Sequence, residues 1–401
     1  MNDPDSKLQK VLAALVCCMC VFFMGCGSTH GHTAAENYSK MTPEEIVDSL
    51  TLEQKTAQML LPAVYNIDEQ KMSEIDYGAV LSKKESLPAS EWRITVDQLQ
   101  TAALDSQATV PYLYGQDDVH GVNYCLDTVI FPHNIALGAA NDPELTKEAG
   151  RITAMEAARC HMLWNFAPTV AVSCDPRWGR TYECYSSDPE IVKNLGRAYT
   201  EGLVENGVVA CAKHFLADGS TIFGTGPDYY PGRLIDRGNA ELSEEELKEL
   251  LGIYQAQIDA GVQTIMISDS SVNGIRMSEH KELLRYLKED MGFDGFLVTD
   301  WNAVKTTSAE TYKEKIITVI NSGIDMLMEV DSFEEVHRIL IDAVYNGDIP
   351  QSRIDDAARR IIKVKKEAGL FENPFQEDAV YNEDLSACRS VAENWLRRVL
   401  Y

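Results

Sequence analysis

Short runs of β-branched and apolar residues alternate with longer stretches of helical periodicity along most of this chain. Such alternation predicts parallel strands joined by crossover helices. The eight expected strands are Met59–Ala63, Gly78–Ser82, Tyr112–Asp117, Leu163–Pro168, Val208–His214, Thr264–Asp269, Gly295–Asp300 and Met326–Glu329. The expected helices include Pro143–Cys160, Asp188–Asn206, Ser243–Ala260, Ser278–Met291, Ala309–Ser322, Phe333–Tyr345 and Gln351–Lys366. Eight alternations suit a (β/α)8 TIM-type barrel, and a doubly wound open sheet would show the same periodicity.

Polar residues stand where the expected strands end, and their placement favours the barrel. They are Asp117, Lys213 with His214, Asp269, Asp300 and Glu329. In a barrel the carboxyl ends of all the strands converge on one face, where active sites are built. The sequence therefore predicts a site on that face.

The charge balance limits the classes of partner. The 401 residues include 62 acidic and 36 basic side chains, for a formal net charge of -26. Such an excess argues against nucleic acid and against anionic membrane surfaces. A neutral substrate is the better fit.

The amino-terminal residues 1–26 have the layout of a secretory signal. Two lysines precede an apolar run from Val11 to Gly25, which is too short for a comfortable membrane span. A small residue directly before Cys26 resembles a bacterial lipobox, which favours lipidation of Cys26 over plain cleavage. Residues 27–40 then form a flexible tether. We expect an exported protein, periplasmic or at the cell surface, with a lipid anchor in a bacterial membrane.

Six further cysteines follow the signal, and none belongs to a CxxC pair or a His/Cys cluster typical of a metal site. Cys174 and Cys184 bracket one loop and could be oxidised in an exported protein. Buried free thiols are the alternative.

Asp300 ends an apolar strand and is followed by Trp301, a combination suited to carbohydrate chemistry. A carboxylate can attack an anomeric carbon, and an indole can stack on the face of a sugar. A purely structural alternative is that Asp300 caps the next helix. Lys213 and His214 could donate hydrogen bonds to hydroxyl groups, or form structural ion pairs.

Two other segments carry dense polar groups. Asp117 could accept hydrogen bonds from two vicinal hydroxyls, although the same segment could be a turn whose carboxylates bond their own backbone. In the stretch Asp175–Glu183, arginine forks can hold ligands or carboxylates. Arg177 and Glu183 could therefore simply hold this loop together.

Six motifs together resemble glycoside hydrolase family 3, the β-glucosidase family, over roughly Glu44 to Pro374. They are Thr128–Gly138, Asn165–Thr169, Asp175–Arg180, Ala212–Phe215, Thr299–Trp301 and Arg353–Ala357, in the family's order and spacing. The resemblance implies a retaining, exo-acting barrel hydrolase with Asp300 as the nucleophile, and no metal or cofactor. It also implies that Asp117, Arg180, Lys213 and His214 bind the sugar in the first subsite, which Trp301 shapes. The released sugar would be β-D-glucose from β-linked oligosaccharides, with β-N-acetylhexosaminidase or β-xylosidase activity as alternatives.

The chain departs from the family at the proton donor. Retention needs a second carboxyl group about 5 Å from the nucleophile. Two-domain relatives take it from an α/β sandwich domain, which would begin where this chain ends, and another chain could supply that domain. Single-domain relatives use a histidine in a Lys-His-Phe-Pro-Gly-His-Gly motif, and Asp218 replaces that histidine here. Asp269, where relatives often have tyrosine, is a further candidate acid and sugar contact.

These departures leave three hypotheses on function. The barrel domain would span residues 41–375, and the helical segment 376–401 would start a linker to the absent second domain. The chain is then a glycosidase, a catalytically impaired sugar-binding lipoprotein, or a truncated fragment.

Overall fold

The fold is built around a parallel sheet that curls into a ring. The computed structural model describes residues 37–82, 85–227, 234–376, 388–393 and 397. Its main sheet has the order β1 (Ala79–Leu81), β2 (Leu113–Gln116), β3 (Trp164–Asn165), β4 (Val209–Phe215), β6 (Thr264–Ile267) and β9 (Phe296–Val298), and every pairing is parallel. All residues of these strands are buried, as expected where helices cover one face and packed side chains fill the other.

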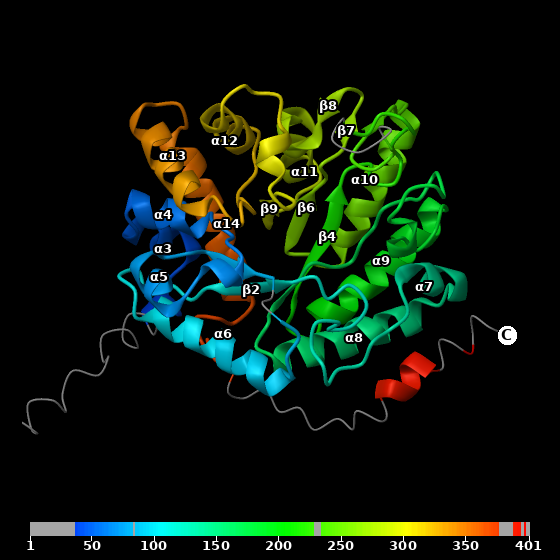
Figure 1. Ribbon diagram of the computed structural model, residues 1–401, viewed down its shortest axis with the longest axis horizontal. Coiled ribbons are helices and arrows are strands. Elements are labelled where there is room, and N and C mark those ends of the chain that lie inside the picture. The colour runs from blue at the N-terminus through cyan, green and yellow to red at the C-terminus, as the bar shows by residue number, and fades with distance from the viewer. Residues whose placement is uncertain (1–36, 83–84, 228–233, 377–387, 394–396, 398–401) are drawn as a thin grey trace, which may run out of the picture.

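Two short segments close this ring. Parallel bridges join Leu60 to Leu327, Ala63 to Leu81 and Val298 to Met326, so the first and eighth predicted strands lie between β9 and β1. The predicted (β/α)8 barrel is therefore confirmed, and the open doubly wound sheet is wrong. Helices surround the ring (Figure 1).

The helices lie close to their predicted ranges. The α-helices are α3 (Pro43–Ser49), α4 (Leu52–Gln58), α5 (Glu69–Glu74), α6 (Ala89–Leu104), α7 (Asn134–Ala140), α8 (Pro143–Arg159), α9 (Pro189–Val204), α10 (Glu244–Asp259), α11 (Lys281–Glu289), α12 (Tyr312–Asn321), α13 (Phe333–Tyr345) and α14 (Gln351–Glu367). Short 3-10 helices are η1 (Val64–Asn66), η2 (Thr181–Glu183), η3 (Met277–Glu279) and η4 (Ala303–Thr306), and a small sheet is formed by β5 (Asn239–Ala240), β7 (Ser271–Val272) and β8 (Ile275–Arg276).

Side-chain caps explain where several helices begin. Ser243 accepts a hydrogen bond from the backbone of Glu246, whose carboxylate accepts from the Ser243 backbone in return. Thr311 and Glu314 form the same reciprocal arrangement at α12. Such capping boxes satisfy amide groups that would otherwise lack partners at a helix start.

The described residues cover the two chain ends only in part. The predicted signal, Cys26 and residues 27–36 of the tether lie outside the described residues. Tyr38 packs edge-on against Phe371, with ring centroids 6.1 Å apart. Residues 388–393 are helical, and Cys388 is buried. Within the described ranges, no helix has the length and apolar character needed to cross a bilayer.

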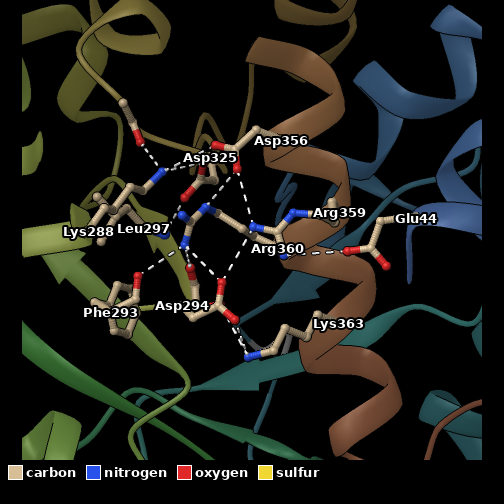
Figure 2. Close-up of polar contacts among 12 residues, drawn as sticks. Glu44, Lys288, Phe293, Asp294, Leu297, Asp325, Asp356, Arg359, Arg360 and Lys363 are labelled. Carbon is tan, nitrogen blue, oxygen red and sulfur yellow. Dashed lines mark hydrogen bonds and ion pairs between the residues drawn. The ribbon is translucent and has the colours of Figure 1, made fainter. Parts of the chain in front are cut away.

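A buried ion network fastens α14 to the last strands of the ring (Figure 2). Asp325 is fully buried and accepts hydrogen bonds from the backbone of Leu297 and, at 2.8 Å, from Lys288 Nζ. Arg353 donates to the same carboxylate. The Arg353–Ala357 motif of the sequence thus has a structural task, which is to bring α14 to Asp325.

Replacing Asp325 should unfold the barrel far more readily than replacing an exposed member of the same network. Asp325→Ala removes the buried carboxylate on which Lys288 and Arg353 converge and leaves them the part-exposed Asp356 as their counter-ion. We therefore expect a loss of about 3–5 kcal/mol in the free energy of unfolding. Asp294→Asn removes an exposed carboxylate that pairs with Lys363, and should cost less than about 1 kcal/mol. Urea unfolding of the two variants measures the difference, and equal losses would contradict the assignment.

Candidate active site

The carboxyl ends of the strands bring the predicted site residues together. Lys213, on β4, donates to Asp117, which follows β2, with 2.6 Å between Nζ and Oδ1. The Lys213 side chain is 4% exposed and that of Asp117 is 44% exposed. The lysine is thus fixed below the surface, and the carboxylate above it is open to a ligand.

Lys213 and His214 are neighbours in sequence and still serve the same face of the barrel. The pairing of β4 with β6 is irregular between Lys213 and Phe215. Because side chains alternate along a regular strand, such an irregularity is needed for consecutive residues to reach one site.

His214 lies between two carboxylates. Its Nδ1 is 2.7 Å from Asp218 Oδ2, and its Nε2 is 3.9 Å from Asp300 Oδ2. Both His214 and Asp218 are buried. The Asp218 contact orients the imidazole so that its other nitrogen faces Asp300.

Asp300 follows β9 and is held as an anion, and no described residue forms an ion pair with it closer than 3.9 Å. Its Oδ1 accepts a hydrogen bond of 2.6 Å from the backbone of Trp301. Burial raises the pKa of Asp300, but the charges of His214 and Arg180 outweigh burial and hold this pKa below its ordinary value. The carboxylate is therefore ionised at neutral pH, and within the described residues the ion-pair partner of its Oδ2 is His214. An ionised oxygen with no hydrogen bond to break is well placed to act as a nucleophile.

Arg180 is fixed by Glu183 rather than by a ligand. Two hydrogen bonds of 2.9 and 2.8 Å join the guanidinium to the Glu183 carboxylate. One guanidinium nitrogen also lies 3.5 Å from His214 Nε2. Arg177 instead pairs with Asp175 at the surface, so Arg177 and Glu183 hold the loop separately, each with its own partner.

Asp269 is buried and surrounded by cations from other segments. Thr306 donates to its Oδ1 at 2.5 Å, and Arg276 lies 3.2 Å from the same oxygen. Arg237 lies 3.3 Å from Oδ2. Burial raises the pKa of Asp269 above its ordinary value even though the two arginines lower it. This carboxyl group is engaged with Thr306 and the two arginines, and the charge of Asp300 also raises its pKa.

Trp301 and Glu329, which also follow expected strands, have different surroundings. Trp301, which directly follows Asp300, is 37% exposed. Glu329 is buried, and accepts hydrogen bonds from the Tyr312 hydroxyl at 2.5 Å and from the Val304 backbone at 3.2 Å. Glu329 therefore supports the segment that follows Trp301.

Sequence reasoning missed the cations that position the site. Arg237 and Arg276 come from loops whose path the periodicity does not describe. The one signal in the sequence is Asp269 itself, because a carboxylate at the end of an apolar strand needs a cation if it is buried. Cys174 and Cys184 are unbonded, and the Cys174 sulfur lies 3.5 Å from Ser220 Oγ. Over the part of the chain that is described, no three His, Cys, Asp or Glu side chains gather as a metal site would require.

The fold and site define a parallel α/β barrel with an anionic carboxylate, two cations and an exposed indole on its carboxyl face. Residues 51–364 match the Glycosyl hydrolase family 3 N terminal domain. The chain belongs to glycosyl hydrolase family 3, as the motifs predicted.

Relatives of known identity agree with this membership. A lysosomal beta glucosidase of Dictyostelium discoideum is 30% identical over 74% of this chain and 37% of its own length. A periplasmic beta-glucosidase of Salmonella typhimurium is 26% identical over 84% of this chain and 44% of its own length. The chain thus spans less than half the length of these two relatives.

Solved structures share the barrel. The exo-1,3/1,4-beta-glucanase of a Pseudoalteromonas species is 33% identical with a TM-score of 0.79, over 91% of this chain and 47% of that chain. The beta-glucosidase of Listeria innocua in complex with glucose is 25% identical with a TM-score of 0.76, over 90% of this chain and 52% of that chain.

The Asp218 and His214 pair should make stability depend on pH in acid. Burial raises the pKa of Asp218, but His214 and Arg180 outweigh it and lower this pKa below 3.8, its ordinary value. A carboxylate with a lowered folded pKa contributes its full stability above pH 3.8 and loses it as pH falls through the folded pKa. We expect Asp218→Asn to cost about 2 kcal/mol at pH 7. The gap between wild type and variant should narrow below pH 3.8 in urea unfolding, and a constant gap would contradict the pairing.

Proposed function

We propose that this chain is the barrel of a retaining, exo-acting glycoside hydrolase that releases a terminal sugar from β-linked oligosaccharides. Asp300 attacks the anomeric carbon and forms a covalent glycosyl-enzyme, which water then hydrolyses. The observation that carries the proposal is the state of Asp300, which is ionised and is followed in sequence by the exposed indole of Trp301. Among the residues that the structure describes, the one ion-pair partner of Asp300 is His214, at 3.9 Å.

The other site residues would bind the sugar ring. Asp117, with its exposed carboxylate, can accept hydrogen bonds from hydroxyl groups, while Lys213 beneath it is a donor. Arg180 is a donor beside His214 Nε2, and this imidazole nitrogen, which faces Asp300, donates or accepts according to its tautomer. Trp301 would stack on one face of the ring. These polar side chains are fixed before a ligand binds, so they lose little conformational entropy on binding. Such an arrangement favours a ligand with many hydroxyl groups.

The proposed sugar is β-D-glucose. The relatives described above are beta-glucosidases and an exo-beta-glucanase, and the Listeria innocua structure holds glucose. A beta-xylosidase of Formosa agariphila is 30% identical over 69% of this chain, which keeps xylose as the second sugar to test.

The presence or absence of a proton donor distinguishes a working hydrolase from the main alternative, a sugar-binding protein with impaired catalysis. Beside Asp300 in the described structure, Glu183 pairs with Arg180, Asp218 with His214, and Asp269 with Arg237 and Arg276. Despite burial, the cations beside Glu183 and Asp218 hold the pKa values of these two carboxyl groups below their ordinary range, so both are poor proton donors. Burial raises the pKa of Asp269, but its oxygens face Thr306 and the two arginines. This observation favours a barrel that binds sugar and carries a nucleophile but depends on a proton donor from outside the described residues. The same barrel without any donor would be a sugar-binding protein with impaired catalysis.

We further propose that the protein is exported and anchored through Cys26. The apolar run before Cys26 supports export, and the two named relatives are described as periplasmic and lysosomal. Both descriptions place the relatives outside the cytosol.

An activated substrate tests the nucleophile independently of the acid. The leaving group of 2,4-dinitrophenyl β-D-glucoside needs no proton, so we expect wild type to cleave it. Asp300→Asn should reduce the rate by a factor on the order of 10⁴. The 2-deoxy-2-fluoro analogue of this substrate should leave one sugar attached to Asp300, detected by peptide mass spectrometry. A label on another residue would refute the role of Asp300.

Cellobiose, assayed beside the activated glycoside, shows whether a proton donor is present. Cleavage of the aryl glycoside alone indicates a nucleophile without its acid, and cleavage of both indicates a donor within this chain. Asp269→Asn, assayed on cellobiose, then shows whether Asp269 is that donor. If neither substrate is cleaved but glucose binds, the sugar-binding alternative holds.

Arg180 should control the acid limb of the pH profile. Its charge helps to lower the pKa of Asp300, so Arg180→Met should raise that pKa and move the acid limb of kcat/KM for the activated glycoside to higher pH. Arg177→Met is the matched control, because Arg177 lies on the same loop but pairs with Asp175 at the surface. Equal shifts in both variants would show that loop damage, rather than charge, causes the effect.

A further inference from the structure

Two buried cysteines outside the site touch each other. Cys125 and Cys160 are 35 positions apart in sequence, and their sulfur atoms lie 3.8 Å apart. Cys125 is 5% exposed and Cys160 is fully buried. The sequence drew attention to Cys174 and Cys184 because they bracket a loop, and the fold instead brings this other pair into contact.

Both cysteines have fixed backbones. Cys160 is the C-cap of α8, and its amide donates to Ala157. Cys125 forms a parallel bridge with Leu87, and its amide donates to Val122 at 2.9 Å. Its sulfur also lies 3.1 Å from Asp127 Oδ1. A disulfide bond is about 2 Å long, which is shorter than the observed distance between the two sulfurs. Because the backbones are fixed, rotation of the two side chains has to close this gap.

The contact joins the segment behind a site residue to a helix. Residues 117–133, which we call the β2–α7 segment, begin at Asp117 and contain Cys125. The helix α8 packs against the ring from outside (Figure 1). A covalent bond between Cys125 and Cys160 would therefore hold the segment that carries Asp117 against the rigid part of the barrel.

We propose that Cys125 and Cys160 are a disulfide site, oxidised by exchange with a small disulfide such as oxidised glutathione. The thiolate of one cysteine attacks the oxidant and releases one glutathione thiolate. The thiolate of the second cysteine then attacks the protein sulfur of the mixed disulfide and releases the second. Two protein thiols and one oxidised glutathione thus become one protein disulfide and two glutathione thiols. Because the sulfurs are buried, exchange takes place during folding, before this region closes.

Mapping of the cross-link in the full chain tests the proposal. The chain is unfolded, refolded with oxidised and reduced glutathione, blocked with N-ethylmaleimide in denaturant and digested without reduction. Trypsin and chymotrypsin together separate Cys160 from Cys174, because Trp164 and Phe166 lie between them. We expect one peptide pair that contains Cys125 and Cys160, lacks two hydrogens and separates on reduction. Independent alkylation of both cysteines, or a bond from either to another cysteine such as Cys388, would overturn it.

Variants add a second readout. In the oxidised wild type, a reductant should lower Tm by roughly 3–6 °C, the effect of losing a typical disulfide in a protein of this size. Cys174→Ser should keep this sensitivity to reductant, and Cys160→Ser should lose it. If Cys160→Ser does not fold, the peptide map of the wild-type protein is sufficient to test the disulfide. Turnover plays no part in either readout, so failure here would leave the role proposed for Asp300 untouched.

Discussion

The ring, and everything built on its carboxyl face, depends on the buried carboxylate of Asp325. The Oδ2 atom of Asp325 accepts a hydrogen bond from the Leu297 amide. In a longer neighbouring strand, a backbone carbonyl would accept this hydrogen bond. Lys288 and Arg353 neutralise the charge, and Arg353 brings α14 with it. Burial lowers the pKa of Lys288 to about 8, which shows how costly this arrangement is. Since Asp300 lies three residues beyond Leu297, the same contact fixes the end of β9 that carries it.

Alternation of cations and anions organises the site itself. Lys213 pairs with Asp117, Arg180 pairs with Glu183, and His214 contacts Asp218. These contacts hold each side chain before any ligand arrives, which is the condition for electrostatic stabilisation of a charged transition state. Asp300 differs from the rest because cations lower its pKa from a distance, and in the described part of the chain the ion-pair partner of its Oδ2, His214, is 3.9 Å away.

Periodicity predicted the barrel well, because alternation and strand-end polarity are both local patterns. The helix predicted at Phe333–Tyr345 is α13 with the same bounds. The predicted strands around Leu60 and Met326 are reduced to single bridges, since side chains such as Asp325 replace part of their ladder. The partners of Asp269 could not be predicted, because Arg237 and Arg276 reach it from loops without periodicity. The contact of Cys125 with Cys160 could not be predicted for the same reason, because it depends on where an irregular segment passes α8.

The seam at which the ring closes joins the two ends of the barrel sequence. Asn66 bonds the backbone of Val330, 264 positions later, close to the bridge between Leu60 and Leu327. A ribosome must therefore synthesise almost the whole barrel before the first strand segment meets its last neighbour. Until then the segment around Leu60, which pairs with β1, and β9 are the edges of an open sheet. Open edges pair readily with other chains. The period between synthesis of α3 and synthesis of Met326 is thus the time at which this chain is most exposed to aggregation.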